Sequence, residues 1–231
     1  MAIEAVLFDF SGTVFRLEDS ELWAIDLTDA DGRPLDAHEV AAIMRAMTAP
    51  VEQFVDFDEA GQYAWDRRDL DPALHRIAYL QVLERSGVPE VPAKQLYERM
   101  LDWQAWSPYP DAGEVFQALQ ERGVPVAVVS NIAWDIRPAF TSRGWDRYIG
   151  DFALSFEIGA MKPDPRIFES ALAALGVAAE NALMIGDSVE ADGGATALGC
   201  EFALVEPIST ADRRTALRDI LLERGLISVP S

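Results

Sequence analysis

Short apolar runs alternate with amphipathic stretches along most of this chain, and this alternation limits most strictly the folds that it can adopt. The first run, residues 3–8, ends at Asp9 and is followed closely by Gly12. Runs of this kind are typical of strands buried on both faces of a parallel sheet, with amphipathic helices as the connections. The other runs that predict strands are Val124 to Val129, Phe152 to Phe156, Ala182 to Ile185, and Phe202 to Val205. The sequence therefore predicts an α/β fold with a doubly wound, Rossmann-like parallel sheet.

Aspartates and glycines mark where the helices between these strands begin and end. Asp111 and Asp164 stand where N-cap residues are expected, because a side-chain oxygen there can accept a hydrogen bond from a free backbone N–H. Gly123, Gly144 and Gly176 are expected to end helices, since glycine readily adopts the left-handed conformation. The predicted helices lie near residues 111–122, 133–143, 165–175, 188–198 and 210–224.

About 100 residues separate the first two predicted strands, far more than one crossover connection needs. Helical patterns occupy this interval after a predicted turn at residues 29–32. A single domain with extra helices is one interpretation; the length of the interval favours an inserted all-helical cap domain. The predicted boundaries are 1–15 and 107–231 for the core domain and 16–106 for the cap. The helices predicted in the cap are Ala37 to Met47, Glu52 to Asp69, Pro72 to Ser86, and Pro92 to Trp106.

The charge of the chain excludes several classes of partner. Its 39 Asp and Glu residues against 19 Lys and Arg give a formal net charge of −20. Duplex nucleic acids and anionic membrane surfaces both attract basic proteins, so neither is expected as a partner. A small anionic molecule held at a local site remains compatible with this charge, and the chain is expected to be a monomer or a homodimer.

Cysteine usage and the N-terminal residues indicate the compartment. Cys200 is the only cysteine and cannot form an internal disulfide, and with two histidines it makes a poor zinc site. No apolar run approaches the roughly 18 residues of a membrane span. The N-terminal residues lack a basic region and reach an acidic residue at position 9, unlike a signal peptide. A cytoplasmic protein is therefore expected.

Polar residues follow the ends of the predicted strands, at the edge where doubly wound sheets bind ligands. Asp9 precedes a turn containing Gly12, whose free backbone N–H groups can hold a phosphate. Ser130 and Asn131 close the second run, and a hydroxyl there can donate to a phosphoryl oxygen. Taken alone, Asp9 is explained equally well by a helix N-cap, and an ordinary N-cap is the better explanation of Ser130 and Asn131.

Two further strand ends carry a scarce cation and a second carboxylate. Lys162 is one of only two lysines, with Lys94, and it directly precedes a proline-stiffened helix entry. Asp187 leaves its strand as Asp9 leaves the first, and Asp192 follows. Two carboxylates facing each other suit a hard divalent cation, usually Mg²⁺. All four strand ends together favour a phosphate site over four separate structural roles.

Four segments resemble motifs of the haloacid dehalogenase (HAD) superfamily, specifically of members with a helical cap after the first motif. DFSGTV is similar to the family's DxDGT[VL] box and VVSN to its second motif. MKPDPRIFESAL resembles the lysine motif, and IGDSVEADGGATALGC resembles the GDSxxxDxxGAxxAG ending. The resemblance covers nearly the whole chain.

The resemblance implies a HAD-like hydrolase, foremost a Mg²⁺-dependent phosphatase acting on a small phosphorylated metabolite. Asp9 would be the nucleophile and form an aspartyl-phosphate that water hydrolyses. Ser130 would hold the phosphoryl oxygens, and Lys162 would neutralise charge on the nucleophile and the transferring group. The implied Mg²⁺ ligands are Asp9, Asp187 and the backbone carbonyl of Ser11.

The resemblance also implies supporting residues around this centre. Thr13 would form a hydrogen bond near the nucleophile, and Asp192 would support Lys162 or a metal-bound water. Arg16 is close enough to the first motif to reach an anionic substrate, although a surface ion pair with Glu18 or Asp19 is an equal alternative. The residues implied to hold phosphate through backbone N–H groups are Phe10, Gly12 and Asn131.

Ser11 departs from the family's phosphatase pattern. Phosphatases of the family usually have a second Asp at this position, which protonates the leaving alcohol and then activates water. Serine has no proton donor of suitable pKa, so a general acid–base factor of roughly 10²–10⁴ is affected. Acyl or aryl phosphates, whose leaving groups need little protonation, are therefore candidate substrates.

Other chemistries of the family remain as alternatives. Dehalogenases have Tyr at this position and lack the metal-binding Asp, so the presence of Asp187 argues against C–halogen cleavage. Phosphonoacetaldehyde hydrolases have Ala there and need a cap lysine, and Lys94 is more simply a surface residue. A catalytically weak phosphate-binding protein or a phospho-accepting receiver domain is the non-enzyme alternative, although the predicted cap argues against a receiver.

Overall fold

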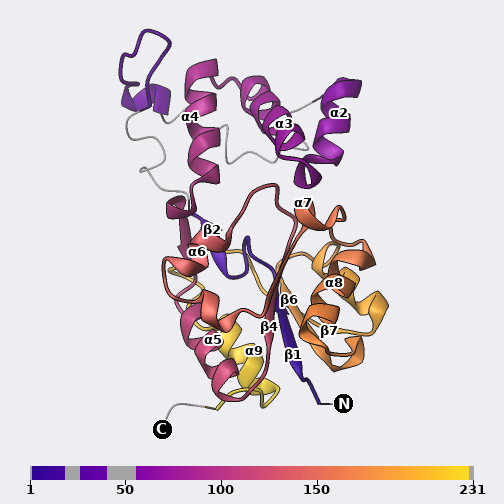
Figure 1. The fold of residues 1–231 in the computed structure, drawn as a ribbon. Helices are drawn as coiled ribbons and strands as arrows, with labels where there is room; N and C mark the ends of the chain where they lie inside the picture. The colour runs from indigo at the N-terminus through magenta and orange to yellow at the C-terminus, as the bar shows by residue number, and fades with distance from the viewer. Residues whose placement is uncertain (1, 19–26, 41–55, 229–231) are drawn as a thin grey trace. The chain divides into compact units, whose positions relative to one another are not determined.

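The structure is a computed structural model that describes residues 2–18, 27–40 and 56–228. The chain forms two compact units, shown in Figure 1. Residues 1–18 and 106–231 form the first unit, and residues 19–105 form the second. Within the described residues, no helix is both long and apolar enough to cross a membrane.

The first unit contains a five-stranded parallel sheet with helices on both faces (Figure 1), which confirms the predicted α/β fold. β1 is the central strand, and its Val6 pairs with Val126 on one side and with Leu183 on the other. The carboxyl ends of β1, β4 and β6 therefore meet at one edge of the sheet. The strand order is β5 (Asp151–Leu154), β4 (Val126–Ser130), β1 (Ala5–Phe8), β6 (Ala182–Gly186) and β7 (Glu201–Leu204).

The strand boundaries differ from those predicted by one or two residues, and two of these differences have a local cause. β4 begins at Val126 because Pro125 has no N–H to donate to a neighbouring strand. β5 ends at Leu154, and Ser155 begins the short helix α7 (Ser155–Ile158). The Ser155 hydroxyl accepts from the Ile132 N–H at 2.8 Å and donates to the Ile132 carbonyl at 3.0 Å. This buried pair of bonds joins the loops after β4 and β5 in place of further strand pairing.

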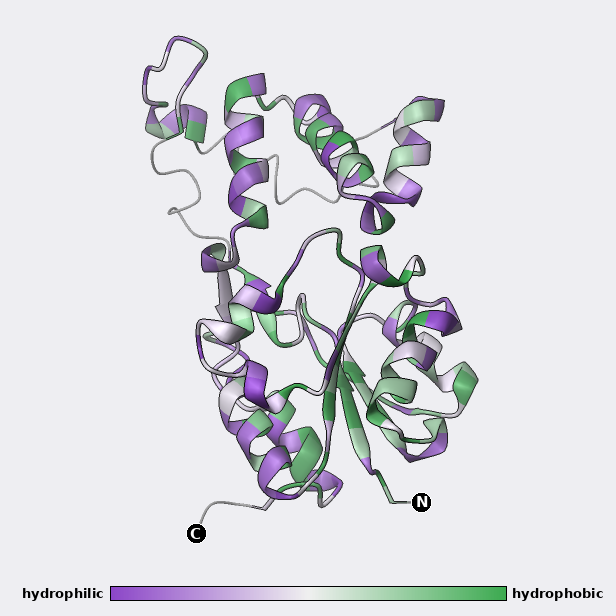
Figure 2. Cartoon of the chain, viewed as in Figure 1, coloured by the Kyte–Doolittle hydropathy of each residue, from purple (hydrophilic) through white to green (hydrophobic). Residues whose placement is uncertain are grey.

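Helix α8 (Pro165–Leu175) covers one face of the sheet. Its N-cap Asp164 accepts from the Arg166 N–H, and Gly176 ends it with a φ of 67°, so its predicted span and caps are confirmed. Ile167 and Phe168 are fully buried and pack in one core with residues of β1, β4 and β6. Figure 2 shows the strands as mainly hydrophobic and the flanking helices as mixed, as expected for a two-sided sheet.

Helices α5 (Ala112–Glu121), α6 (Arg137–Thr141) and α9 (Ala216–Glu223) belong to the opposite layer, where the Phe116 ring lies 5.4 Å from that of Phe8. Asp111 stands at the N-cap position of α5, as predicted, but its side chain makes no capping hydrogen bond to that helix. It accepts instead from the Arg218 N–H of α9 at 3.0 Å. Asp111 thus joins two helices of this layer.

Three predicted helices of this unit are shorter or of another type. α6 begins only at Arg137, whose N–H donates to the Asp135 side chain. Residues 192–198 form a 3₁₀ helix, and residues 189–191 form a separate hydrogen-bonded turn in place of the predicted first turn of an α-helix. α9 begins at Ala216 because the preceding segment is bound to the loop after β1, as described below.

A short antiparallel ribbon carries both ends of the inserted segment. β2 (Phe15–Leu17) pairs with β3 (Trp106–Pro108), with Arg16 opposite Ser107. The predicted boundaries after residues 15 and 106 fall within this ribbon. Residues 16–18 and 106, predicted to belong to the cap, belong to the first unit, and the two units meet at residues 18/19 and 105/106.

The second unit is helical in the residues that the structure describes. Asp58 caps α2 (Glu59–Asp66), and Asp71 caps α3 (Pro72–Arg85), each through its side chain. Asp29 holds the predicted turn by accepting from the Asp31 and Arg33 N–H groups. The helix predicted up to Trp106, α4 (Glu90–Leu101), ends five residues earlier. Residues 41–47 and 52–55 of the predicted helices lie outside the described residues, while 37–40 are helical.

A buried histidine links α3 to α4. His75 is 1% exposed, and its Nδ1 lies 2.9 Å from the Tyr97 hydroxyl. Its ring stacks on Tyr79 with 4.3 Å between centroids. Burial and the nearby Arg68 charge lower the pKa of His75 from 6.5 to about 4. The imidazole is therefore neutral in the folded protein at neutral pH.

Acidification should destabilise the second unit through His75. Because the pKa of His75 is lower in the folded state, neutral His75 contributes fully to the free energy of unfolding above pH 6.5. This contribution is lost as the pH falls towards 4. The loss approaches roughly 3 kcal/mol. Thermal unfolding measured between pH 7 and 4 should show a steeper fall in Tm for wild type than for His75→Gln. Exposed His38 provides the control, and His38→Gln should keep the wild-type slope. Parallel slopes for wild type and His75→Gln would contradict the assignment.

Candidate active site

Lys162 lies at the centre of a buried ionic cluster at the carboxyl edge of the sheet. Its ammonium donates to Asp9 Oδ1 at 2.6 Å, to Asp192 Oδ1 at 2.6 Å and to the Val129 carbonyl at 2.9 Å. An ammonium has three donors, so these acceptors use all of them. The side chain is 3% exposed. Lys162 is therefore held in one orientation against Asp9.

Asn131 holds the backbone of Lys162 in place. Its Oδ1 accepts from the Lys162 N–H at 2.6 Å, and its Nδ2 donates to the Lys162 carbonyl at 3.0 Å. Asn131 directly follows β4, so this pair of bonds ties the lysine loop to the end of that strand. The sequence predicted only a backbone contribution from Asn131, because no local pattern shows which distant backbone its amide contacts.

Three carboxylates meet beside this lysine. Asp9, Asp187 and Asp192 each offer a carboxylate oxygen, and these atoms lie within 4.8 Å of one another. Asp9 follows β1, Asp187 follows β6, and Asp192 begins the 3₁₀ helix. Each was a predicted site residue, and the sheet brings them together.

Two glycines permit this close approach. A Cβ at Gly12 would lie 2.2 Å from Asp187 Oδ2, and φ at this position is +78°. A Cβ at Gly186 would lie 2.2 Å from Asp192 Cγ. Any larger residue would push the carboxylates away, so both glycines shape the site.

The charges in the cluster do not balance. Burial raises the pKa of Asp9 to about 7, and the neighbouring Asp192 and Asp187 charges add to this while Lys162 opposes it. Burial and the Asp192 charge raise the pKa of Asp187 to about 6. Burial alone would lower the pKa of Lys162, but Asp9 and Asp192 raise it, so the ammonium stays charged. One ammonium faces three carboxylates, and a further cation is needed to keep all three ionised.

The residues present fit a hard divalent cation. Among the described residues, Asp9 Oδ2 is buried and has no hydrogen-bond partner. Carboxylate oxygens and backbone carbonyls are the ligands that Mg²⁺ prefers. Asp9 and Asp187 supply such oxygens within 4.8 Å of each other, and the excess negative charge favours a cation at this place.

The other predicted residues of the first loop have distinct surroundings. Thr13 is fully buried, and its Oγ1 lacks a hydrogen-bond partner within the part of the chain described. The Phe10 ring packs 5.0 Å from the rings of both Phe15 and Trp106, which anchors the loop. Ser11 is exposed, and Ser130, the last residue of β4, is buried at the same edge of the sheet.

Arg16 does not join the ionic cluster. Its guanidinium donates to the Pro207 carbonyl, and its Nε lies 3.5 Å from Glu18. Of the two predicted roles of Arg16, this arrangement matches the ion pair with Glu18, not contact with an anionic substrate. A different arginine, Arg213, reaches the loop after β1; it lies beyond the last motif, and no sequence pattern marks it.

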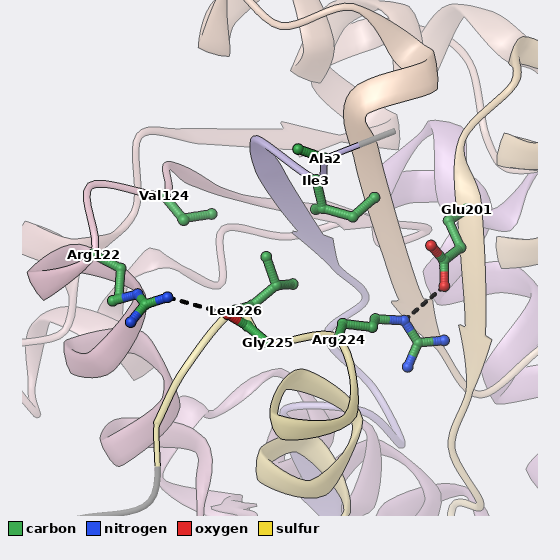
Figure 3. Close-up of a pocket in the computed structure, with 8 residues that line it drawn as sticks. All are labelled: Ala2, Ile3, Arg122, Val124, Glu201, Arg224, Gly225 and Leu226. Carbon is green, nitrogen blue, oxygen red and sulfur yellow. Dashed lines mark hydrogen bonds and ion pairs between the residues drawn. The ribbon is translucent and has the colours of Figure 1, made fainter.

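A pocket of about 460 Å³ lies at the other edge of the sheet, near the start of β1 and β7 (Figure 3). Its charged residues are already paired within the pocket. Arg224 Nε lies 2.7 Å from Glu201, and Arg122 donates to the Gly225 carbonyl at 3.1 Å. The pocket is remote from Asp9, which follows the opposite end of β1.

Comparison with known proteins agrees with this geometry. The family model of the haloacid dehalogenase-like hydrolases matches residues 3–198, and the chain belongs to this family, as its motifs predicted. It is 32% identical over 222 residues to the ribulose-1,5-bisphosphate 5-phosphatase of Halopiger xanaduensis, covering 90% of this chain and 87% of that protein. It is 31% identical over 159 residues to the phosphoserine phosphatase of Thermus thermophilus, covering 64% of each. The fold is similar to a HAD phosphatase structure from Thermococcus onnurineus, with a TM-score of 0.61, 20% identity and coverage of 98% and 100%.

Proposed function

We propose that this protein is a Mg²⁺-dependent phosphatase that acts on a small phosphorylated metabolite by phosphoryl transfer to Asp9. The observation that carries the proposal is the buried cluster in which Lys162 bridges Asp9 and Asp192 beside Asp187. The relatives named as phosphatases support the same reaction class. We propose the cytoplasm as its compartment, and a monomer or homodimer as its state.

Asp9 acts as the nucleophile in this proposal. Its carboxylate forms an oxygen–phosphorus bond while the bond from phosphorus to the leaving oxygen breaks. Water then attacks phosphorus, which releases inorganic phosphate and regenerates the carboxylate. Lys162 orients Asp9 and offsets the negative charge on the transferring group, and Ser130, with the backbone N–H groups of residues 10, 11 and 131, binds the phosphoryl oxygens. The Gly12 N–H, which was predicted to hold phosphate as well, instead donates to the Phe15 carbonyl at 2.7 Å.

Asp9, Asp187 and the backbone carbonyl of Ser11 would hold Mg²⁺, with Asp192 keeping Lys162 in place. When bound, the ion supplies positive charge that offsets the phosphate and the carboxylates. Thr13 Oγ1, buried without a partner among the described residues, is available to the first loop or to substrate. These roles follow the family motifs onto matching positions.

Ser11 narrows the class of substrate. Its hydroxyl cannot protonate a leaving alkoxide, whereas an aryl or acyl phosphate leaves as a weakly basic anion. We propose such phosphates as the preferred substrates. The helical unit, residues 19–105, is the proposed cap domain that selects among them, since it is inserted between β2 and β3, shortly after the catalytic loop.

Phosphate release from p-nitrophenyl phosphate, measured with Mg²⁺ and with excess EDTA, tests this function. Turnover should require Mg²⁺, and Asp187→Asn should raise the Mg²⁺ concentration for half-maximal activity by at least about 10-fold. Mg²⁺ should also raise the Tm of wild type more than that of Asp187→Asn. Asp146→Asn, at an exposed position, is the control and should behave as wild type. Equal turnover in EDTA would contradict the metal, and no release from any aryl or acyl phosphate would contradict the function.

A further inference from the structure

Arg213 is a buried arginine that reaches the loop after β1 from the opposite end of the chain. It is 5% exposed and precedes α9. Its Nη1 donates to the Gly12 carbonyl at 2.6 Å and to the Glu206 carbonyl at 3.0 Å, and its Nη2 donates to the Thr13 carbonyl. One guanidinium thus binds two successive carbonyls of the loop that carries Asp9 and joins them to the segment after β7.

No carboxylate lies within ion-pair distance of this guanidinium in the described part of the chain, and its Nε has no hydrogen-bond partner there. The guanidinium carbon lies 3.1 Å from the centroid of the Tyr109 ring, and the Tyr109 hydroxyl donates to the Ile208 carbonyl at 2.8 Å. Burying a cation without an ion-pair partner is costly. A purely structural link between loops could be made by a neutral side chain at lower cost, so the retained charge itself needs an explanation.

The two loop carbonyls supply one. A hydrogen bond from a charged guanidinium is stronger than one from a neutral donor, and Arg213 makes such bonds to both the Gly12 and the Thr13 carbonyl. Gly12 in turn lies against Asp187, because a Cβ at Gly12 would be 2.2 Å from Asp187 Oδ2. Holding the Gly12 peptide therefore also holds the loop against this carboxylate.

The hydrogen bonds within the loop after β1 show what Arg213 holds in place. The Gly12 N–H donates to the Phe15 carbonyl at 2.7 Å, and the Val14 N–H to the Phe10 carbonyl at 3.0 Å, so the loop is a tight turn. The Ser11 carbonyl shares a planar peptide unit with the Gly12 N–H, so the bond from Gly12 to Phe15 fixes the direction of that carbonyl, and Arg213 holds the two peptide units that follow. Arginine's planar fork can hold both carbonyls at once.

We propose that Arg213 is a positioning residue of the catalytic loop, holding the Gly12 and Thr13 carbonyls so that the Ser11 carbonyl and the Asp187 carboxylate are set for Mg²⁺. Arg213 touches neither substrate nor metal. Its contact with the loop is independent of the proposed function; its effect on Mg²⁺ rests on that function.

The test compares Arg213→Gln and Arg213→Lys with Arg214→Gln, a matched control at the exposed neighbouring position. In the protein without metal, amide hydrogen exchange of residues 10–15 should be at least about 10-fold faster in Arg213→Gln. Titration with Mg²⁺ alone, followed by calorimetry, should show affinity weakened about 10-fold. With p-nitrophenyl phosphate, kcat should fall by about 10–100-fold with little change in KM. Arg213→Lys should lie between, since it keeps the charge and loses the fork.

If Arg213 has only a structural role, replacing it would lower Tm. At temperatures well below the melting range, Mg²⁺ affinity and kcat would then keep their wild-type values. That result would overturn the proposal, as would unchanged amide exchange at residues 10–15. If Arg213→Gln fails to fold, the same measurements on Arg213→Lys decide. If wild type neither binds Mg²⁺ nor releases phosphate, the proposed function fails; amide exchange still decides the contact between Arg213 and the loop.

Discussion

Replacing Asp9 with asparagine should reduce phosphate release by at least about 10⁴-fold, because the amide cannot form the proposed covalent intermediate. Lys162 keeps two acceptors in Asp9→Asn, Asp192 Oδ1 and the Val129 carbonyl, so the cluster should stay assembled. Because burial and neighbouring carboxylates raise the pKa of Asp9, its charge disfavours the folded state above its ordinary pKa of 3.8. The variant should therefore melt at or above the wild-type Tm at pH 8 without Mg²⁺.

Asp192→Asn is the matched comparison for this loss. It also removes one carboxylate partner of Lys162, yet it leaves the nucleophile unchanged. Its activity should fall by a smaller factor, and intact-protein mass spectrometry should detect a phosphorylated species during turnover of wild type but not of Asp9→Asn. Comparable activity in Asp9→Asn and wild type would exclude Asp9 as the nucleophile.

Ser11→Asp should increase the hydrolysis of alkyl phosphates by roughly 10²–10⁴-fold, because a carboxyl group at this position can protonate the leaving alkoxide. The exposed position of Ser11 leaves room for the longer side chain. The gain should be smaller for p-nitrophenyl phosphate, whose leaving group needs little protonation. The measurement is kcat/KM for a series of phosphate esters of increasing leaving-group pKa, in wild type and variant.

Ser11→Asn controls for size and polarity, since asparagine matches the shape of aspartate without an acid. It should keep the steep wild-type dependence on leaving-group pKa, and Ser11→Asp should flatten it. Rapid wild-type turnover of a simple alkyl phosphate, unaffected by either substitution, would mean that another group supplies the proton.

The strands and most helices of the first unit could be predicted because their signals are local. A continuous apolar run predicts a buried strand whatever lies elsewhere, and α8 has its cap, its apolar face and its terminal glycine within one stretch of sequence. Errors arose where a distant partner decided the outcome. Asp111 is of the residue type that favours N-caps and stands at the N-cap of α5, but its carboxylate accepts a hydrogen bond from the Arg218 N–H of α9 instead.

The sequence alone determined the family, the α/β class and which charged residues stand at strand ends, because each depends on residue order within short motifs. Only the tertiary structure decided which atoms meet. It placed Lys162 against Asp9 and Asp192 across β1, β4 and β6, and it brought Arg213 onto the loop after β1, about 200 residues away. Such contacts depend on the order in which strands pair and on how loops pack above them. No periodicity or local spacing carries that information, since it arises only when distant segments share one sheet edge.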